Sequence, residues 1–436
     1  MILSAALLLI AAQALLLASQ PVPLASPPAP PPASSRHEII VEPGRLREAE
    51  QALAAGADGL RVVFRPGEYS LEPDPYDDTE CGNCEEEATP VHTTCGILVR
   101  GRGISIEGSG APESVVLRTG AGYGILFEDC EACSLRSVTV TGGVRDSSAD
   151  ATDAAVVAKR SRVVIEGCVL SDNLGDSTVV RRTVVGIAGI AGRRGSQLEV
   201  RKNRILRNSW DGIALYRGAH AVIEDNRIDG VDLARGDDIG GGRGVGIGIT
   251  WDARADIRRN FVTRYWKGIG VFVDADATVQ ENVVQDVAAW GICLWDAGKG
   301  KPSARIQRNV VSDTGAFGIG ITRDATGGDP GSCSDNVVRR TGQNPKYDDP
   351  GYYGPQRPIA LMGSVPGFNL SANLLFENRR AAYVKGDTDL AAAEFFAKAI
   401  PLARALEKHP ALGDARALRE LIAGPPAGAI SDSLPH

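Results

Sequence analysis

The sequence predicts an all-β fold, a parallel β-helix built as a solenoid of short stacked strands, followed by a short C-terminal α-helical segment. Three observations support this prediction: an asparagine motif that occurs six times, a Gly-apolar-x-apolar segment that occurs five times, and a regular spacing between the two. One such segment is too short to bury its apolar side alone, so it must stack on its own copies.

The asparagine motif consists of an apolar residue, two polar residues, asparagine, any residue and an apolar residue. It occupies residues 200–205, 223–228, 257–262, 279–284, 306–311 and 333–338. Asparagine tolerates left-handed backbone angles at a sharp bend, and its amide can hydrogen-bond to the amide one coil away. We therefore expect a column of asparagines at one bend of the solenoid.

The glycine segments read as the strands between these bends. They occupy residues 212–215, 246–249, 268–271, 291–294 and 318–321. In three coils the asparagine follows this glycine by 14 residues, as Asn226 follows Gly212. The next glycine mostly follows the asparagine by 8 or 9 residues, so a core coil has about 23 residues. The apolar second and fourth residues, such as Ile213 and Leu215, point inward because strand side chains alternate.

The repeated pattern resembles the right-handed parallel β-helix proteins of the pectin-lyase-like superfamily, over roughly residues 40–375. The resemblance implies that residues 52–69 form a helix and first strand that open the fold. It also implies that the sheet containing the glycine strands is the polysaccharide cleft.

The two ends of the chain differ in composition from the repeats. Residues 1–20 are almost wholly apolar and predict a signal peptide, with a membrane anchor as the alternative; residues 21–36 form a Pro-rich tether. We expect the β-helix to occupy 37–386 and a helical cap on the open end of the stack to occupy 387–436, with helices at 389–398, 401–408 and 414–423. These features predict a secreted or periplasmic protein, and we expect a monomer.

Eight cysteines fit an oxidising compartment. Five of them lie early in the chain: Cys81, Cys84, Cys95, Cys130 and Cys133. The spacing around His92 would also permit zinc, but disulfides are the favoured interpretation. The other three, at positions 168, 293 and 333, are expected to be buried thiols or local bridges.

The outward face of the glycine strands predicts a trough with a floor of small residues between two rows of aromatic side chains. These aromatic residues are Tyr216, Phe272 and Trp295 in one row and Trp210, Trp266 and Trp290 in the other. Aromatic faces stack on sugar rings. Lys267 or Arg217 would neutralise the carboxylate of an acidic polysaccharide. The alternative is that the protein's own loops or its C-terminal helices fill the trough.

Candidate catalytic residues are four aspartates: Asp237 and Asp238 in an insertion over 229–243, together with Asp211 and Asp274. Paired carboxylates can act as general acid and base, or bind Ca²⁺, although the aspartates that recur after the glycine strands also suit turns. The Gly-Asp-Asp at 236–238 resembles a polygalacturonase motif, but the other motifs of that family are absent, as are those of pectate lyases and alginate epimerases.

These observations predict a carbohydrate-binding protein that acts as a polysaccharide lyase, hydrolase or epimerase, or else a non-catalytic surface scaffold or adhesin. The net charge of −7 leaves no basic excess to neutralise phosphates, so a nucleic-acid partner is excluded. No cofactor is required by either interpretation, and Ca²⁺ is the one ion that the acidic turns allow.

Overall fold

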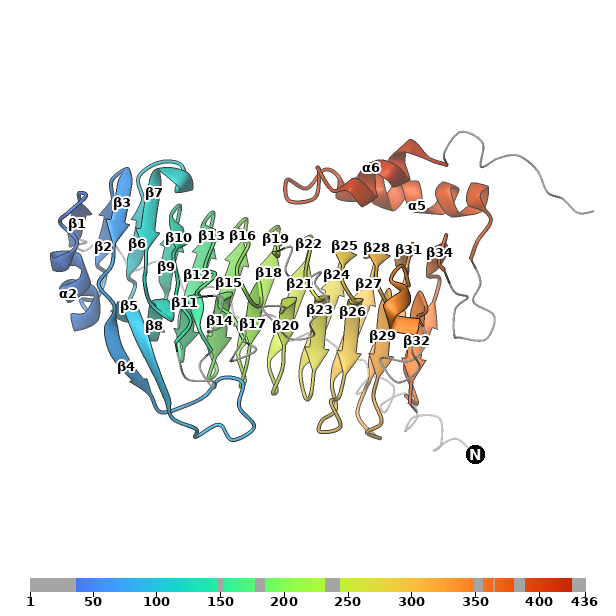
Figure 1. The fold of residues 1–436 in the computed structure, drawn as a ribbon, viewed down its shortest axis with the longest axis horizontal. Helices are drawn as coiled ribbons and strands as arrows, with labels where there is room; N and C mark the ends of the chain where they lie inside the picture. Colours follow the sequence, from blue (N-terminus) through green and yellow to red (C-terminus); the bar gives the residue numbers. More distant parts are fainter. Residues whose placement is uncertain are drawn as a thin grey trace, which may run out of the picture. The chain divides into compact units, whose positions relative to one another are not determined.

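The computed structural model describes residues 37–146, 152–176, 185–231, 244–348, 356–363, 365–379 and 389–425. Within them the strands form three long, mainly parallel sheets that run side by side along a solenoid (Figure 1). The predicted signal peptide and tether, residues 1–36, lie outside the described residues. None of the helices in the described ranges is long and apolar enough to cross a membrane.

Sheet A contains, in spatial order, β1 (Glu38–Val41), β2 (Arg61–Phe64), β6 (Ser105–Gly108), β9 (Cys133–Arg136), β12 (Arg162–Glu166), β15 (Gln197–Arg201), β18 (His220–Glu224), β21 (Arg254–Arg258), β24 (Asp276–Gln280), β27 (Ser303–Gln307), β30 (Gly331–Ser334) and β33 (Asn369–Ser371). Sheet B contains β3 (Gly67–Ser70), β7 (Val115–Arg118), β10 (Thr139–Thr141), β13 (Val169–Ser171), β16 (Arg204–Leu206), β19 (Arg227–Asp229), β22 (Phe261–Thr263), β25 (Val283–Val287), β28 (Val310–Thr314), β31 (Val337–Arg339) and β34 (Leu374–Phe376). Sheet C contains β32 (Ile359–Met362), β29 (Ile319–Thr322), β26 (Trp290–Trp295), β23 (Lys267–Phe272), β20 (Val245–Ile249), β17 (Ile213–Leu215), β14 (Ala188–Arg193), β11 (Ala154–Lys159), β8 (Tyr123–Glu131), β5 (Val91–Arg102) and β4 (Asp74–Asp78). Short 3-10 helices lie at Pro112–Ser114 and Pro345–Asp348.

Each regular coil passes from sheet C through sheet A to sheet B, as β17, β18 and β19 do. The glycine strands of the repeat are strands of sheet C, and their register is the one that the spacing predicts. Ile213 pairs with Ile247, and the column continues through Ile269, Ile292 and Ile319. The insertion before β20 therefore leaves the pairing of the coils unchanged. The exception to parallel pairing is β4, which is antiparallel to β5.

The hydrophobic core fills the inside of the solenoid along its whole length. The inward residues of sheet C, such as Ile213 and Leu215, are fully buried, as the alternation predicts. Helix α2 (Arg47–Ala55) lies at the first coils and buries Ala49 and Leu53 in this core. The predicted helix and first strand at the start of the fold are thus present, and β1 adds a strand that the repeat did not reveal.

The asparagine column forms at the bend between sheets A and B. The Nδ2 of each asparagine donates to the Oδ1 of the next, from Asn203 to Asn336, over 2.9–3.1 Å, and Asn373 adds a further rung. The left-handed backbone lies one position earlier than we expected. It belongs to the residue before each asparagine, such as Asp225 with φ 56° and Arg259 with φ 54°. The asparagine amide holds the bend by donating to nearby carbonyls, as Asn226 does to Val200 and Glu224.

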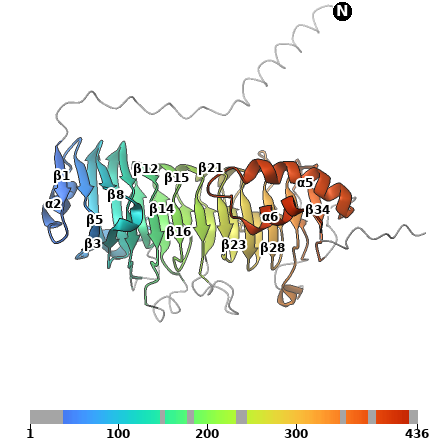
Figure 2. The ribbon, with the colours of Figure 1, turned by 90° about the horizontal axis from the view of Figure 1, so that it is seen from above.

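The C-terminal helices lie along the side of the stack, where the sequence predicted a cap over its end (Figure 2). Helices α5 (Ala392–Leu406) and α6 (Arg416–Ala423) cover the outer face of sheet B, where Phe395 and Leu418 pack in one cluster with Phe261, Val283 and other outward residues of that sheet. The helices expected at 389–398 and 401–408 are one continuous helix through Pro401. Burial of its apolar face on both sides of the proline outweighs the loss of one hydrogen bond there.

Two of the early cysteines, Cys81 and Cys84, form a disulfide, which confirms that this part of the chain contains at least one. The six others are buried cysteines outside this disulfide, including those at 168, 293 and 333 inside the repeats. A zinc site is ruled out at these positions, because two of its ligands are oxidised and His92 is exposed and bonded to Asp77.

Candidate functional site

The outward face of sheet C has the floor of small side chains that the repeat predicts. One register column runs from Ala214 through Gly248, Gly270 and Cys293 to Gly320. Gly270 leaves room for the Phe272 ring, which folds back over the strand, because a Cβ at this position would lie 2.1 Å from that ring. Aromatic side chains therefore lie on this floor as well as beside it.

The two aromatic rows converge on Lys267, the first residue of β23. The Lys267 Nζ lies 4.3 Å from the ring centre of Trp290, 4.5 Å from that of Trp266, 4.8 Å from that of Trp295 and 5.2 Å from that of Phe272. Lys267 is 97% buried by this enclosure, and no carboxylate lies within 4 Å of it among the described residues. Burial lowers the pKa of its ammonium group, against weaker opposite effects of Cys293 and Asp211.

Most residues of the two aromatic rows are less exposed than we expected. Trp295 is exposed, at 37%, whereas Tyr216 and Trp290 are buried. Trp210, Trp266 and Phe272 are partly buried. The rings shield one another and Lys267, so the free aromatic surface of the trough is concentrated at Trp295.

Asp211, one of the predicted catalytic residues, lies two residues before β17 and faces the same floor. Its Oδ1 accepts a hydrogen bond of 2.6 Å from the Val245 amide, and its Oδ2 would lie 3.7 Å from a Cβ on Gly248. Burial raises the pKa of Asp211 to about 7, although the Val245 bond and Lys267 act in the opposite direction. Burial, and then the nearby Asp211 carboxyl, also raise the pKa of Tyr216. Asp211 can therefore hold or release a proton near neutral pH.

A loop between β4 and β5 covers part of the trough. We call residues 79–90 the acidic strap, because they contain Glu80, Glu85, Glu86 and Glu87 and the Cys81–Cys84 disulfide. Figure 1 shows this loop leaving β4 and extending along the stack. The alternative that the protein's own loops fill the trough is therefore correct for this part, whereas the C-terminal helices cover sheet B.

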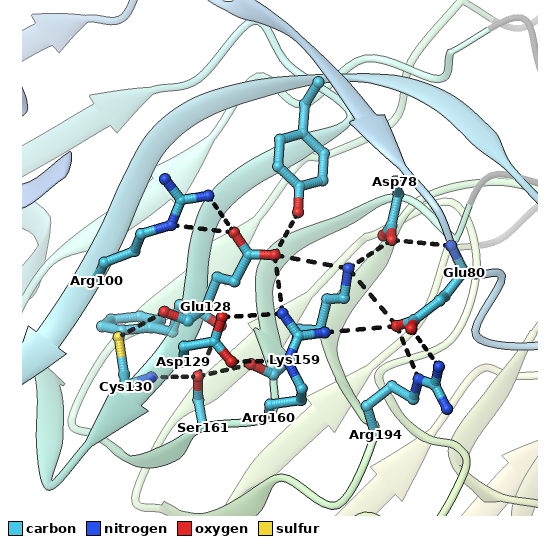
Figure 3. Close-up of polar contacts among 12 residues, drawn as sticks. Asp78, Glu80, Arg100, Glu128, Asp129, Cys130, Lys159, Arg160, Ser161 and Arg194 are labelled. Atoms are coloured by element: carbon cyan, nitrogen blue, oxygen red, sulfur yellow. Dashed lines mark hydrogen bonds and ion pairs between the residues drawn. The ribbon is translucent and has the colours of Figure 1, made fainter.

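The strap is anchored at its root by a buried network of charges. Asp78, at the end of β4, accepts a 2.7 Å hydrogen bond from Lys159 and is bonded by Arg193. Figure 3 shows Lys159 between Asp78, Glu80 and Glu128. Asp78, Lys159 and Arg193 are at least 96% buried, so each charge depends on the others for its compensation.

The rest of the strap is held by more exposed contacts, one from each successive turn of sheet C. Arg194 binds Glu80 and Glu87, and Arg217 donates to the Glu85 carbonyl at 3.1 Å. The Trp251 Nε1 donates to the Asn83 Oδ1 at 3.2 Å. Arg217 also stacks on the Trp251 ring, with 4.2 Å between its Cζ and the ring centre. Arg217, predicted to neutralise a sugar carboxylate, is thus occupied by the strap.

Two cavities flank the strap. The outer one, of about 650 Å³, lies at the turns and is lined by Arg194, Arg217, Trp251, Asp252 and Asp274 with others. The inner one, of about 310 Å³, lies between the strap and the floor of sheet C. Its lining includes the disulfide on one side and Ala188, Ala191, Trp210 and Tyr216 on the other.

The aspartates after the sheet C strands act mainly as turn residues. Asp252 accepts from the Gly218 amide, Asp274 from the Lys301 amide, and Asp296 from the amides of Gly298 and Asp324. Three of these four bonds cross to a neighbouring coil, so the aspartates tie coils together. Within the described residues, no three His, Cys, Asp or Glu side chains group into a metal site. Asp237 and Asp238 lie outside the described residues.

Sequence reasoning identified Asp211, Lys267 and the aromatic rows, but it did not name Arg193 and did not place Trp251 or the strap in the site. The signal for the strap was present as a run of acids at 77–87, interrupted by two cysteines three residues apart. Its partners lie 81–214 residues further along the chain, so no local pattern links them.

Comparison with known proteins agrees with this architecture. The family model described as the right handed beta helix region matches residues 96–236 and 188–347, more than half of the chain. No curated protein matches the sequence. Similar solved structures include an alginate lyase from Paenibacillus (12% identity over 78% of this chain and 99% of that chain, TM-score 0.39). Others are the A-module of a mannuronan C-5 epimerase from Azotobacter vinelandii (14%, 79% and 92%, TM-score 0.38) and a surface adhesin of Streptococcus pneumoniae (10%, 75% and 71%, TM-score 0.41). From the family match and the three stacked sheets, we conclude that the chain belongs to the family of right-handed parallel β-helix proteins.

Proposed function

We propose that this chain is an exported protein that binds an acidic polysaccharide on the outward face of sheet C. The observation that carries the proposal is Lys267, a cation that is 97% buried with no carboxylate within 4 Å among the described residues. Burying a charge without an opposite charge is unfavourable, and aromatic faces offset only part of this cost. A carboxylate from a uronic acid would supply the missing opposite charge.

Trp295 provides the second element of this site. It belongs to the same cluster, with its ring centre 4.8 Å from the Lys267 Nζ, and it is exposed. An indole face beside a cation suits an anionic sugar, because the C–H face of the sugar ring stacks on the indole while its carboxylate meets the ammonium group. A neutral sugar would gain the stacking alone.

Export is supported by two features of the chain. Residues 1–20 have the composition of a signal peptide, and the Cys81–Cys84 disulfide is a bond that forms and persists in oxidising compartments. An extracellular or periplasmic location would bring the sheet C face into contact with polysaccharides.

A second activity, acid–base catalysis on the bound polymer, is favoured by Asp211. A carboxyl group with a pKa of about 7, on the same face as a lysine whose pKa is lowered, can donate or accept a proton at neutral pH. This pair would serve a lyase, a hydrolase or an epimerase. Asp237 and Asp238 stay candidates for the partner group.

The test is to measure binding to alginate and polygalacturonate and to neutral glucans, together with release of reducing ends and of unsaturated uronates. Lys267→Met should abolish the preference for acidic polymers, and Trp295→Ala should weaken binding roughly tenfold, the worth of one stacked ring. Lys202→Met is the matched control, because Lys202 is exposed at the bend between sheets A and B.

Three results would decide between the functions. Binding without turnover would make the chain a polysaccharide-binding scaffold. Turnover that falls about a hundredfold or more in Asp211→Asn would identify an enzyme. The absence of saccharide binding, or binding that is equal in the wild type and Lys267→Met, would refute the proposal.

A further inference from the structure

We infer that the sheet C site is closed at its N-terminal side and takes the end of a polysaccharide chain, with the acidic strap as its wall. This inference rests on the proposed function and specifies which part of the polymer binds. A site that is closed at one end cannot accept the middle of a long chain, whereas a groove open at both ends can.

The N-terminal end of the trough is filled by the protein itself. The floor column continues from Ala214 and Ala191 to Val157 and Leu126, so the floor side chains become larger toward the first coils. Val157 and Leu126 are fully buried although they face outward, and they pack in a cluster with Tyr123 and Cys95. No saccharide can pass over these coils without displacing this packing.

The strap root completes the wall. Asp78 crosses over the same coils to reach Lys159, on β11, and Arg193, on β14. These groups are almost wholly buried, so separating them would leave uncompensated charges. The root of the strap at Asp78 is therefore fixed. The rest of the strap is held near the surface by Arg194, Arg217 and Lys299, and a higher salt concentration would weaken these contacts.

The inner cavity is the place where the terminal sugar would lie. It has about 310 Å³, at the lower end of the range for small-molecule sites. One of its lining residues is Tyr216, 94% buried, with no hydrogen bond from its hydroxyl group among the described residues. A sugar hydroxyl group in this cavity would give the Tyr216 hydroxyl group a hydrogen-bond partner.

The opposite side of the site leads outward. Tyr216 directly follows β17, and Trp295 is the last residue of β26, three coils further along the stack. At about 4.8 Å per strand, this separation is roughly 14 Å, the span of a short oligosaccharide. Trp295 is exposed, and its register neighbours Thr322 and Met362 are partly exposed. The rest of the polymer would leave along this edge.

The experiment compares intact polygalacturonate and alginate with the same polymers after partial acid hydrolysis to about one-tenth of their chain length. Binding is followed by tryptophan fluorescence at equal saccharide mass. Recognition of chain ends predicts that the half-saturating mass concentration falls about tenfold on hydrolysis, because the number of ends rises tenfold. Unchanged half-saturation, with binding that is still lost in Lys267→Met, would overturn the closed-end inference and leave the proposed function standing. If hydrolysis leaves the half-saturating concentration unchanged and binding does not depend on Lys267, the closed-end inference and the proposed function are both overturned.

Gly82→Val tests the wall directly. A Cβ at Gly82 would lie 3.1 Å from the Arg193 Cδ and 3.2 Å from the Tyr216 Cδ2, so a valine crowds the contact between the strap and the floor, and one of the two must give. We expect the difference in half-saturating mass concentration between intact and hydrolysed polymer to become smaller in Gly82→Val. The difference should persist in Ala88→Val, because Ala88 is an exposed residue of the same strap. A full tenfold difference in folded Gly82→Val would contradict the assignment of the strap as the wall. If the variant does not fold, the wild-type comparison decides alone.

Discussion

The raised pKa of Asp211 makes a quantitative prediction about stability and pH. The pKa changes from 3.8 in the ordinary carboxyl group to about 7 in the folded protein, a difference of about three units. At 1.36 kcal/mol per unit, ionising Asp211 would cost the folded state about 4 kcal/mol, as an order of magnitude. The folded state favours the protonated carboxyl group, because its pKa is raised. The stability associated with protonated Asp211 is therefore fully present below about pH 4 and is lost as the pH rises through about 7.

Asp211→Asn removes the ionisation while keeping an oxygen that can accept from the Val245 amide. The variant should match the wild type at pH 4 within about 1 kcal/mol and become more stable than it by up to about 4 kcal/mol at pH 9. The assay is urea or thermal unfolding of both proteins at pH 4, 7 and 9. Taking the difference between the two proteins cancels the titration of the other groups.

Asp274→Asn is the matched control for this experiment. Asp274 is exposed and also accepts from one backbone amide, that of Lys301, so Asp274→Asn makes the same substitution at a comparable hydrogen bond without the burial. If the stability difference between Asp211→Asn and the wild type does not change between pH 4 and pH 9, the reasoning is refuted, because the folded protein then accommodates the Asp211 carboxylate without cost.

The remaining predictions concern the ladder and the disulfide. Asn260→Leu should lower the free energy of unfolding by roughly 1–3 kcal/mol, because its neighbours lose buried hydrogen bonds, whereas the same change at the partly exposed last rung, Asn373, should cost less in thermal melts. Cys81 and Cys84 should resist alkylation in the denatured protein until a reductant is added, while Cys168 reacts on denaturation alone; reaction of all three without reductant, detected by peptide mass spectrometry, would show that the disulfide is absent.

The repeat made most of the fold predictable. Because each coil pairs with copies of itself, the spacing of Gly212, Gly246 and Gly268 specified the register of sheet C without knowledge of the loops. The position of helix α5 was less predictable. Its apolar face could cover any exposed apolar surface. It covers sheet B, where Phe261 and Val310 are apolar and point outward, but the sequence does not identify this sheet as its partner.

The candidate site was predictable in composition but not in arrangement. Alternation placed the floor and the aromatic residues on one face, but the way Trp266 and Trp290 enclose Lys267 depends on side-chain orientations in three dimensions. The contact of Trp251 with Asn83 joins residues 168 positions apart. Such contacts arise from charge and shape complementarity after the stack has formed, and they leave no period in the sequence.

The asparagine ladder has a direction, and this has a consequence for how the chain is assembled. Each Oδ1 receives the backbone amide and the Nδ2 of the preceding asparagine, so every rung depends on the coil that follows it. During synthesis the earlier coils emerge first, and each new coil supplies the acceptor for two donors already in place. A chain shortened from its C-terminus would expose such donors at its last bend. One shortened from its N-terminus would leave only an oxygen with spare capacity, which water can satisfy, so the two ends of the solenoid should tolerate deletion unequally.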